Sequence, residues 1–233
     1  MNGGLARALE ALRAGRPVLV ADASSRENEV DAILAADTAT PEWMGWIIRH
    51  SSGLLCAPLT GALADRLELP LMVERSEDAR GTAYTVTVDA AVGVTTGISA
   101  SDRATTVRAL AAVDASPRDL IRPGHVLPLR AVDGGVLERP GHTEAAVDLV
   151  RLAGTGEVGV IAELVRDDGE MLSFDEAVEL ANNAGLVLLH VDDIVEFRRQ
   201  YPGLPAADAP EKNHHNNNTS TRAAEALTRG ARR

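Results

Sequence analysis

Cysteine is almost absent from this chain of 233 residues, which contains Cys56 and no other. A framework of disulfides and a zinc site built from cysteines are therefore both excluded. Aromatic residues make up only 3% of the sequence although 45% of it is hydrophobic, so alanine and valine must fill much of the interior. A chain of this length can bury a full hydrophobic core.

Long apolar runs are missing as well. No stretch approaches the ~20 consecutive apolar residues of a membrane-spanning helix, and the N-terminus lacks the apolar core of a signal peptide. We therefore expect a soluble, cytoplasmic protein that does not bind a membrane.

Basic residues are fewer than acidic ones: the chain has 23 Lys and Arg and 34 Asp and Glu, which gives a net charge of −11. This balance argues against a nucleic-acid partner, since phosphate backbones attract Lys and Arg. It does not exclude a small anionic substrate, because one Arg and a divalent metal can outweigh the overall field locally. A dinucleotide fingerprint, a Walker motif and a nucleophile elbow are absent too.

Helical and extended patterns alternate irregularly along the chain. Apolar spacing and capping residues predict helices at 5–13, 41–47, 61–67, 101–112, 142–154, 173–185 and 192–200. Apolar runs predict strands at 17–21, 32–36, 54–57, 84–88, 125–129, 158–165 and 186–191. Alternating and continuous strands are mixed, which favours an α+β fold with a mixed sheet and helices packed on it.

The connecting segments divide the chain into one domain and a tail. Residues 74–82 read as a polar loop, and a turn at 133–135 leads through a short extended run into the helix at 142–154. From residue 205 the composition changes to Ala, Pro, Asn and His, and then to a basic ending. We expect one domain over 1–204 and a disordered tail over 205–233.

The heptapeptide Arg-Pro-Gly-His-Thr-Glu-Ala at 139–145 opens that helix. Arg139 offers a permanent planar cation that suits phosphate or carboxylate, and Gly141 lets the backbone approach a ligand closely. His142 and Thr143 lie at a helix N-terminus, which attracts anions, and a histidine ring nitrogen can bind a metal. An ordinary helix start, with Thr143 as its cap, fits this motif equally well.

A polar loop at 22–31 carries four carboxylates around one arginine. Glu27, Glu29 and Asp31 alternate along it, so in an extended loop they would share one face. Oxygen ligands of this kind suit Mg²⁺, which takes one or two protein carboxylates and completes its shell with water and substrate. For the loop alone, a simply solvated surface is the favoured interpretation.

Two further residues stand out by their context. Glu163 is the one charge in the apolar run 158–165, where an unpaired buried carboxylate would be costly, so it faces solvent or serves a site. We favour the site. His125 ends an Arg-Pro-Gly-His sequence at 122–125 that repeats the pattern of 139–142, which suggests two imidazoles delivered by similar bends.

The helix start at 102–106 follows several hydroxyl residues and is either a phosphate cradle or a plain N-cap. Carboxylates, two histidines, an arginine and hydroxyl-rich helix starts together favour a divalent metal acting with a phosphorylated small molecule. Enolisation next to a carbonyl is the natural chemistry for such a set.

Several motifs point, in order, to one family. They are Arg-Glu-Asn-Glu at 26–29 with Asp31, Val-Thr-Thr-Gly-Ile-Ser-Ala at 94–100 with Asp102, Arg103, Thr105 and Thr106, Arg-Pro-Gly-His at 122–125, Gly-Gly-Val-Leu at 134–137, and the heptapeptide at 139–145. From about residue 5 to residue 200 the chain resembles 3,4-dihydroxy-2-butanone 4-phosphate synthase.

The resemblance implies an α+β fold, a homodimer with sites at the interface, and Mg²⁺ as cofactor with Mn²⁺ as the other candidate. It implies a lyase of riboflavin biosynthesis that converts D-ribulose 5-phosphate to a four-carbon ketone phosphate and formate. Many relatives carry a fused GTP cyclohydrolase with a cysteine zinc site. This chain has neither that length nor those cysteines, so we expect the single-function form.

Residue roles follow from the same motif match. The resemblance implies that the metal ligands are Glu27 and His142. It implies that the sugar phosphate is held by Arg26, Asp31, Thr105, Arg139, Gly141 and Thr143. It implies that the groups that act in or line the catalytic centre are His125, Glu163, Glu29 and Cys56.

The acidic loop departs from the family pattern. Ala23, Ser24 and Ser25 stand where the family has carboxylates, and Val30 stands where it has glycine. Fewer acids should weaken a second metal or remove a proton acceptor, and Val30 would strain any backbone with positive φ. Two functions stay open: the lyase itself, and a diverged paralogue with the same fold. Such a paralogue would act on a related hydroxyketone or sugar phosphate in a specialised pathway, or would only bind one.

Overall fold

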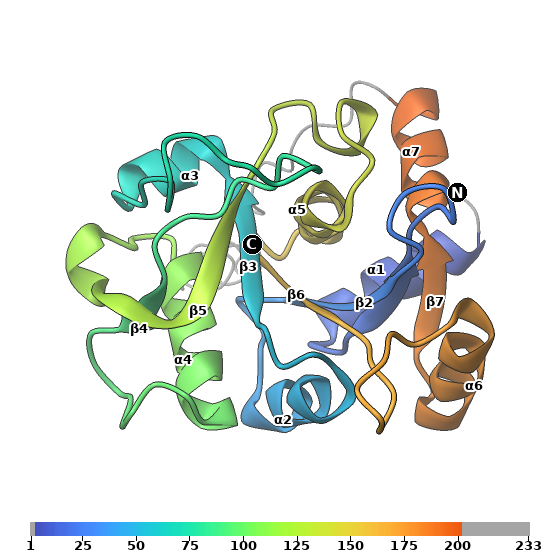
Figure 1. The fold of residues 1–233 in the computed structure, drawn as a ribbon, viewed down its shortest axis with the longest axis horizontal. Helices are drawn as coiled ribbons and strands as arrows, with labels where there is room; N and C mark the ends of the chain where they lie inside the picture. The colour runs from blue at the N-terminus through green and yellow to red at the C-terminus, as the bar shows by residue number, and fades with distance from the viewer. Residues whose placement is uncertain (1–2, 202–233) are drawn as a thin grey trace, which may run out of the picture.

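A single mixed sheet organises the computed structural model, which describes residues 3–201 (Figure 1). The tail expected at 205–233 lies outside these residues. In the described part of the chain, seven strands follow the order β4-β5-β3-β6-β2-β1-β7. Their bounds are β1 Val18–Ala21, β2 Val30–Ala35, β3 Cys56–Thr60, β4 Val88–Ala90, β5 Leu120–Ala131, β6 Gly159–Glu163 and β7 Val187–His190.

Parallel and antiparallel pairs occur side by side in this sheet. Strand β2 runs antiparallel to both β1 and β6, whereas β3 is parallel to β5 and β1 is parallel to β7. Strand β4 pairs antiparallel with β5 at one edge. The predicted α+β fold with a mixed sheet is thus confirmed.

Helices cover both faces of the sheet. They are α1 Gly3–Arg13, α2 Pro41–His50, α3 Gly61–Arg66, α4 Ala100–Ala111, α5 His142–Ala153, α6 Phe174–Ala184 and α7 Val191–Gln200. In Figure 1, α2, α4 and α6 lie below the sheet, and α5 and α7 lie above it.

Two clusters of buried side chains fill the space between sheet and helices. Because side chains alternate along a strand, Ala32 and Leu34 of β2 join one cluster with α2 and α4. Ile33 and Ala35 join the other with α1 and α5. Both faces of β2 are therefore dry, and the loop before it is anchored to a rigid strand.

Helix ends follow the capping residues of the sequence. Thr40 caps α2 and Pro41 is its first residue. Ser173 and Glu176 form the predicted capping box of α6. Helix α5 ends at Gly154 in the left-handed conformation. These predictions are confirmed.

The strand predicted at 84–88 is wrong in position. Tyr84 and Thr85 form only isolated bridges, and β4 begins at Val88. The alternation suggested one wet face, but Thr85 is fully buried, and its amide and hydroxyl both donate to the carbonyl of Pro128. The hydroxyl thus bonds to a carbonyl within the interior instead of to water.

Two boundaries near the site also differ from the sequence prediction. Helix α4 begins one residue early because Ser99 Oγ accepts the amide of Asp102. The extended run expected after the turn at 133–135 is a 3₁₀ turn at Gly135–Leu137, held by the amide of Val136 donating to a carboxylate oxygen of Asp148.

Strand ends shift too. Strand β3 begins at Cys56 and not at residue 54, and β6 ends at Glu163, which therefore lies at the end of its strand. Asp31 belongs to β2 instead of to the loop, and it pairs in register with Glu163. The carboxylates of Asp31 and Glu163 therefore lie side by side on neighbouring strands.

Candidate functional site

One pocket gathers most of the predicted site residues. It lies where β2, β6, β3 and the start of α5 meet. Its lining consists of Arg26, Glu27, Glu29, Asp31, Cys56, Thr82, Tyr84, Leu129, Arg139, His142, Thr143, Ile161 and Glu163. Segments from residue 26 to residue 163 thus meet at one opening.

Asp22 shapes the acidic loop of this pocket. Its carboxylate, which is buried, accepts the amide of Glu27 at 3.0 Å, the amide of Glu29 at 3.0 Å and the guanidinium of Arg26 at 3.1 Å. Asn28 turns the loop between them with a φ of 58°. Glu27, Glu29 and Asp31 therefore line the same pocket, which matches the face they were predicted to share.

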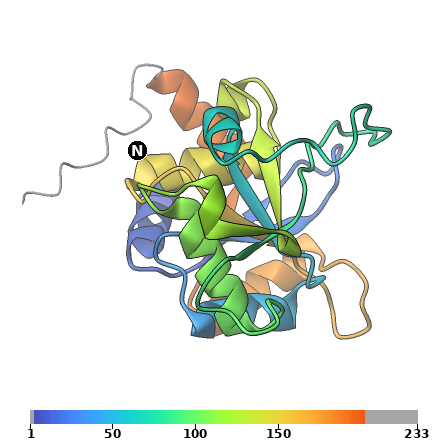
Figure 2. The ribbon, with the colours of Figure 1, turned by 90° about the vertical axis from the view of Figure 1, so that its left-hand side faces the viewer.

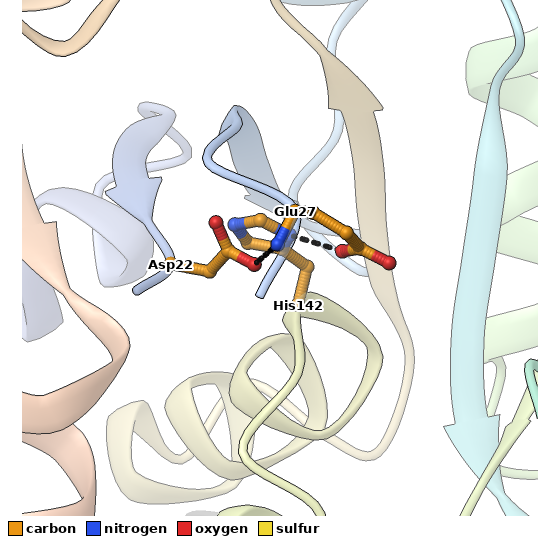
Figure 3. A group of neighbouring side chains, drawn as sticks. All are labelled: Asp22, Glu27 and His142. Atoms are coloured by element: carbon orange, nitrogen blue, oxygen red, sulfur yellow. Dashed lines mark hydrogen bonds and ion pairs between the residues drawn. The ribbon is translucent and has the colours of Figure 1, made fainter. Parts of the chain in front are cut away.

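The imidazole of His142 has a defined orientation. Its Nε2 lies 3.1 Å from the carbonyl oxygen of Val20, which can only accept, so Nε2 carries the hydrogen. The other nitrogen, Nδ1, faces the carboxylates: it lies 3.8 Å from Glu27 Oε2 (Figure 3) and 3.6 Å from Asp31 Oδ1. In the neutral ring, a lone pair therefore points into the pocket.

Electrostatics couple these groups. The neighbouring His142, together with Arg26, lowers the pKa of Glu27 to about 2 despite partial burial. Burial opposes a charge on His142, but the carboxylates of Asp31, Glu27 and Asp22 outweigh it and raise its pKa to about 9. Burial raises the pKa of Asp31 to about 7. Without a metal, a cationic imidazole thus balances the acids.

The donor set fits a divalent cation. One ligand atom each from Asp22, Glu27 and His142 lie within 4.8 Å of one another. Asp31 Oδ1 is buried and has no hydrogen-bond partner among the described residues, although buried polar atoms are almost always paired. Two or more carboxylate oxygens and one imidazole nitrogen suit a hard cation such as Mg²⁺ or Mn²⁺.

Other predicted groups lie on the neighbouring strands β6 and β3. Glu163 accepts a hydrogen bond of 2.7 Å from the hydroxyl of Ser52, which holds its carboxylate. Burial, with the charges of Glu163 and Asp31, raises the pKa of Cys56 far above its usual range. Cys56 therefore lines the pocket as a neutral thiol and not as a thiolate nucleophile.

Two cationic groups, Arg26 and Arg139, also line the pocket. Arg139 Nη1 contacts Glu144 at 2.6 Å and Arg26 contacts both Asp22 and Glu27. A Cβ at Gly141 would lie 2.7 Å from Arg26 Nη2 and 2.8 Å from Arg139 Nη1, so any larger residue would push both guanidinium groups from these positions. Gly141 thus lies beside the pocket.

The loop 74–82 contributes residues that the sequence analysis missed. Arg80 donates to the carbonyl of Arg26 and lies 3.9 Å from Glu27, and Thr82 accepts a hydrogen bond from Arg139. Figure 2 shows this loop, in teal, projecting from the body beside the acidic loop, in blue. Its charges were visible in the sequence, but nothing local indicated where it folds back.

His125 and Thr105 do not line this pocket. His125 pairs with Asp89 at the β4 edge, and the Thr105 hydroxyl donates to the carbonyl of Ser101 within α4. Strand β4 is separated from β2 by β5, β3 and β6. Within residues 3–201, one copy of the chain therefore keeps these two predicted residues apart from the others.

The substituted positions of the acidic loop face outward. Ala23, Ser24 and Ser25 are exposed and do not line the pocket. Val30 is buried in β2, and among the described non-glycine residues positive φ occurs only at Asn28 and Glu68. The strain considered for Val30 requires positive φ, and this condition is not met because Val30 lies in the extended backbone of β2.

Comparison with known proteins agrees with this geometry. The family model for 3,4-dihydroxy-2-butanone 4-phosphate synthase matches residues 6–197. The chain belongs to this synthase family. It is an enzyme family of lyases, and the predicted membership is confirmed.

Curated relatives of this chain are longer than the chain itself. It is 54% identical over 198 residues to the riboflavin biosynthesis protein RibBA of Salinispora arenicola, covering 85% of this chain and 47% of the relative. It is 54% identical over 197 residues to RibBA of Nocardia farcinica, covering 84% and 48%. The chain thus spans about half the length of the curated relatives it matches.

Solved structures of synthases share the fold. A 3,4-dihydroxy-2-butanone 4-phosphate synthase in complex with two magnesium ions superposes with a TM-score of 0.83 at 48% identity, covering 85% of this chain and 98% of the other. RibBX, a two-domain synthase from A. baumannii, gives 0.80 at 39% identity, covering 83% and 57%. In residues 3–201, no helix is long and apolar enough to cross a membrane.

Proposed function

We propose that this chain is a Mg²⁺-dependent lyase of riboflavin biosynthesis that converts D-ribulose 5-phosphate to 3,4-dihydroxy-2-butanone 4-phosphate and formate. One observation carries the proposal: the donors of Asp22, Glu27 and His142 lie beside the guanidinium groups of Arg26 and Arg139. A sugar phosphate offers hydroxyl and carbonyl oxygens to the first set and a phosphate dianion to the second. Family membership supports the same reaction.

Each group then has a task. Arg26, Arg139 and the Thr143 hydroxyl at the start of α5 bind the phosphate. A divalent cation held by Glu27 and His142 supplies positive charge that polarises the substrate carbonyl and hydroxyls.

Proton transfer falls to Glu29 of the loop, to Glu163 at the end of β6 and to His125. Burial and neighbouring carboxylates raise the pKa of Glu29, which makes it a stronger base for the proton at C3. Glu163 and His125 move protons in the later steps. Loss of water, rearrangement of the carbon skeleton and re-addition of water release C4 as formate, so the reaction needs no oxidant.

A homodimer would bring the separated residues together. Some exposed apolar side chains lie beside these groups: Ile121 pairs in register with Asp89, and Leu71 and Met72 are joined to Thr85 and to the pocket residue Tyr84. Exposed apolar groups of this kind mark protein interfaces. We infer that the segment bearing His125 and Thr105 covers the pocket of a second copy.

Formate release is the direct test. The purified chain is incubated with D-ribulose 5-phosphate and MgCl₂ or MnCl₂, and formate is measured with and without EDTA. We expect formate in equimolar amount to the ketone phosphate, and none after chelation. No formate at high enzyme concentration would overturn the lyase assignment.

The same assay separates the diverged paralogue. A rise in melting temperature with substrate and Mg²⁺, but without turnover, would indicate a binding protein. Turnover of another hydroxyketone or sugar phosphate alone would indicate a specialised pathway. The exposure of Ala23, Ser24 and Ser25 favours the lyase, since their changes leave the lining carboxylates in place.

A further inference from the structure

His125 is bound at two points by a single carboxylate. Its backbone amide donates to Asp89 Oδ1 at 2.9 Å, and its ring Nδ1 lies 2.8 Å from Asp89 Oδ2. The Asp89 side chain is 11% exposed and that of His125 is 41% exposed. The carboxylate is thus enclosed while the imidazole reaches the surface.

The carboxylate selects one tautomer of the ring. An ionised carboxylate can only accept, so Nδ1 must carry the hydrogen in this contact. Within residues 3–201, Nε2 of His125 has no hydrogen-bond partner. In the neutral ring, its lone pair is therefore free to take a proton from a bound molecule.

Gly97 closes one side of the pair. Its backbone comes so near that a Cβ would lie 2.1 Å from Asp89 Oδ2 and 2.6 Å from His125 Nδ1, and its φ is 92°. Asp102 holds this backbone in place by accepting the amide of Gly97 at 3.0 Å and the hydroxyl of Thr95 at 2.7 Å. The start of α4 thus forms a fixed wall against the pair.

Gly124 closes the other side. A Cβ there would lie 2.0 Å from the carbonyl carbon of Val88 and 2.2 Å from the amide nitrogen of Asp89. Strand β5 therefore lies directly on β4 at this point, and the amide of Gly124 donates to Thr87 Oγ1 at 3.1 Å. Gly97 and Gly124, from different segments, thus let the backbone pack closely around Asp89 and His125. This packing holds the two side chains in contact.

We propose that Asp89 is the positioning residue of His125: it fixes the Nδ1–H tautomer and aims Nε2 as the atom that transfers a proton in the reaction. This inference rests on the proposed function for the role of His125. A positioning carboxylate behind a general base is a recurring arrangement in enzymes, because the wrong tautomer cannot accept the proton.

Asp89→Asn in the full chain tests the inference. An amide keeps the shape, and its oxygen can still accept the backbone amide of His125, but its NH₂ then faces Nδ1 and favours the hydrogen on Nε2. We expect kcat for formate release to fall by about 100-fold or more, with KM within about threefold. Asp65→Asn, which removes an exposed carboxylate from the pair with Arg130, should leave both values unchanged.

Imidazole ¹⁵N shifts give a readout that does not depend on turnover. In chain labelled at histidine, with His125→Gln used for assignment, the wild type should show the Nδ1–H tautomer and Asp89→Asn the Nε2–H tautomer. Gly97→Ala, which forces the carboxylate from the ring, should also disturb the tautomer and serves if Asp89→Asn does not fold. No formate from the wild type would overturn the proposed function, whereas the ¹⁵N shifts would still decide the tautomer.

Two results would overturn the inference itself. One is a wild-type ring that is mainly the Nε2–H tautomer. The other is an Asp89→Asn variant that keeps wild-type kcat.

Discussion

The imidazole of His142 is tied at Nε2 to Val20 and turns Nδ1 toward Glu27 and Asp31. Its pKa of about 9 lies above the usual value of 6.5, so near pH 7 the ring is protonated when no metal is bound. A metal must displace that proton, because only the neutral ring has a lone pair at Nδ1.

Metal affinity should therefore rise with pH. Between pH 6.5 and 8.5 we expect the Kd for Mn²⁺ or Mg²⁺ to fall by up to about tenfold per unit, levelling above the pKa of His142. Titration calorimetry in buffers of different ionisation enthalpy would detect the released proton. An affinity that is constant over this range would contradict the protonated state of His142.

Substitution should separate metal binding from proton transfer. His142→Ala removes a ligand, so we expect metal affinity and turnover to fall together.

Glu163→Gln keeps the acceptor for the Ser52 hydroxyl, so metal affinity and the fold should be unchanged while kcat falls by about 10²–10⁴-fold. Equal metal affinity in His142→Ala and wild type would show that His142 is not a ligand.

Among single residues, the sequence indicated those whose chemistry is unusual for the segment in which they stand. Glu163 in an apolar run was found because burying charge is costly, and Glu27, Glu29 and Asp31 were found because they alternate along one loop. Arg80 and Asp89 were not, since an arginine in a polar loop and an acid in a strand are ordinary locally. Only contacts between distant segments, such as Arg80 with Arg26, reveal them.

Helix boundaries were predictable where a capping residue lies next to them in the sequence. Thr40 and Pro41 at α2, and Ser173 with Glu176 at α6, act through their own backbone neighbours. The strand expected at 84–88 was wrong in position, because Tyr84 and Thr85 meet their partners Leu129 and Leu71 only in isolated bridges. Strand edges depend on partners that the local pattern does not contain.

The outward-facing part of the acidic loop should act on the metal only through long-range charge. We expect the triple variant Ala23→Asp, Ser24→Glu, Ser25→Asp to lower the Mg²⁺ concentration for half-maximal activity a few-fold at low salt. The effect should shrink above about 0.15 M salt, where the Debye length is about 8 Å. Activity against Mg²⁺ at two ionic strengths measures it.

A control adds two negative charges, against three in the triple variant, to a surface that does not line the pocket. Asn182→Asp with Asn183→Asp changes exposed residues of α6 and should leave the Mg²⁺ requirement unchanged. An unaltered requirement in the triple variant would mean that the loop acids do not limit metal binding.

Val30→Gly, which restores the family residue, should destabilise the fold. Val30 is 2% exposed in β2, so the change removes buried apolar surface and adds backbone freedom, at a cost of about 2–4 kcal/mol. Urea unfolding measures this, and Val30→Ala separates the side-chain part from the backbone part. An unchanged midpoint would show that the side chain of Val30 contributes little to the core.

On the scale of the whole molecule, the separation of His125 from the pocket makes a mixing experiment decisive. His125→Ala and His142→Ala are each expected to be inactive. In a heterodimer of the two, one pocket with intact His142 receives an intact His125 from its partner. Co-expression should restore about a quarter of wild-type activity, since half of the dimers are mixed and each has one complete site.

The control pairs two pocket variants, His142→Ala and Glu163→Gln. Each pocket takes both His142 and Glu163 from one and the same chain. In a mixed dimer one pocket therefore lacks His142 and the other lacks Glu163, and activity should not exceed that of the separate variants. Restoration by the control pair, or none by the first pair, would contradict a site shared between two copies.

Asp22 has a consequence for how the metal arrives. Its carboxylate already holds the amides of Glu27 and Glu29 and the guanidinium of Arg26. The conformational entropy of the loop, about 1–2 kcal/mol per ordered residue, is therefore lost during folding and not on metal binding. The loop is therefore already ordered when the ion binds. The affinity for the ion then depends on the donor atoms and on the dehydration of the ion, and the ion can bind and dissociate without a rearrangement of the backbone.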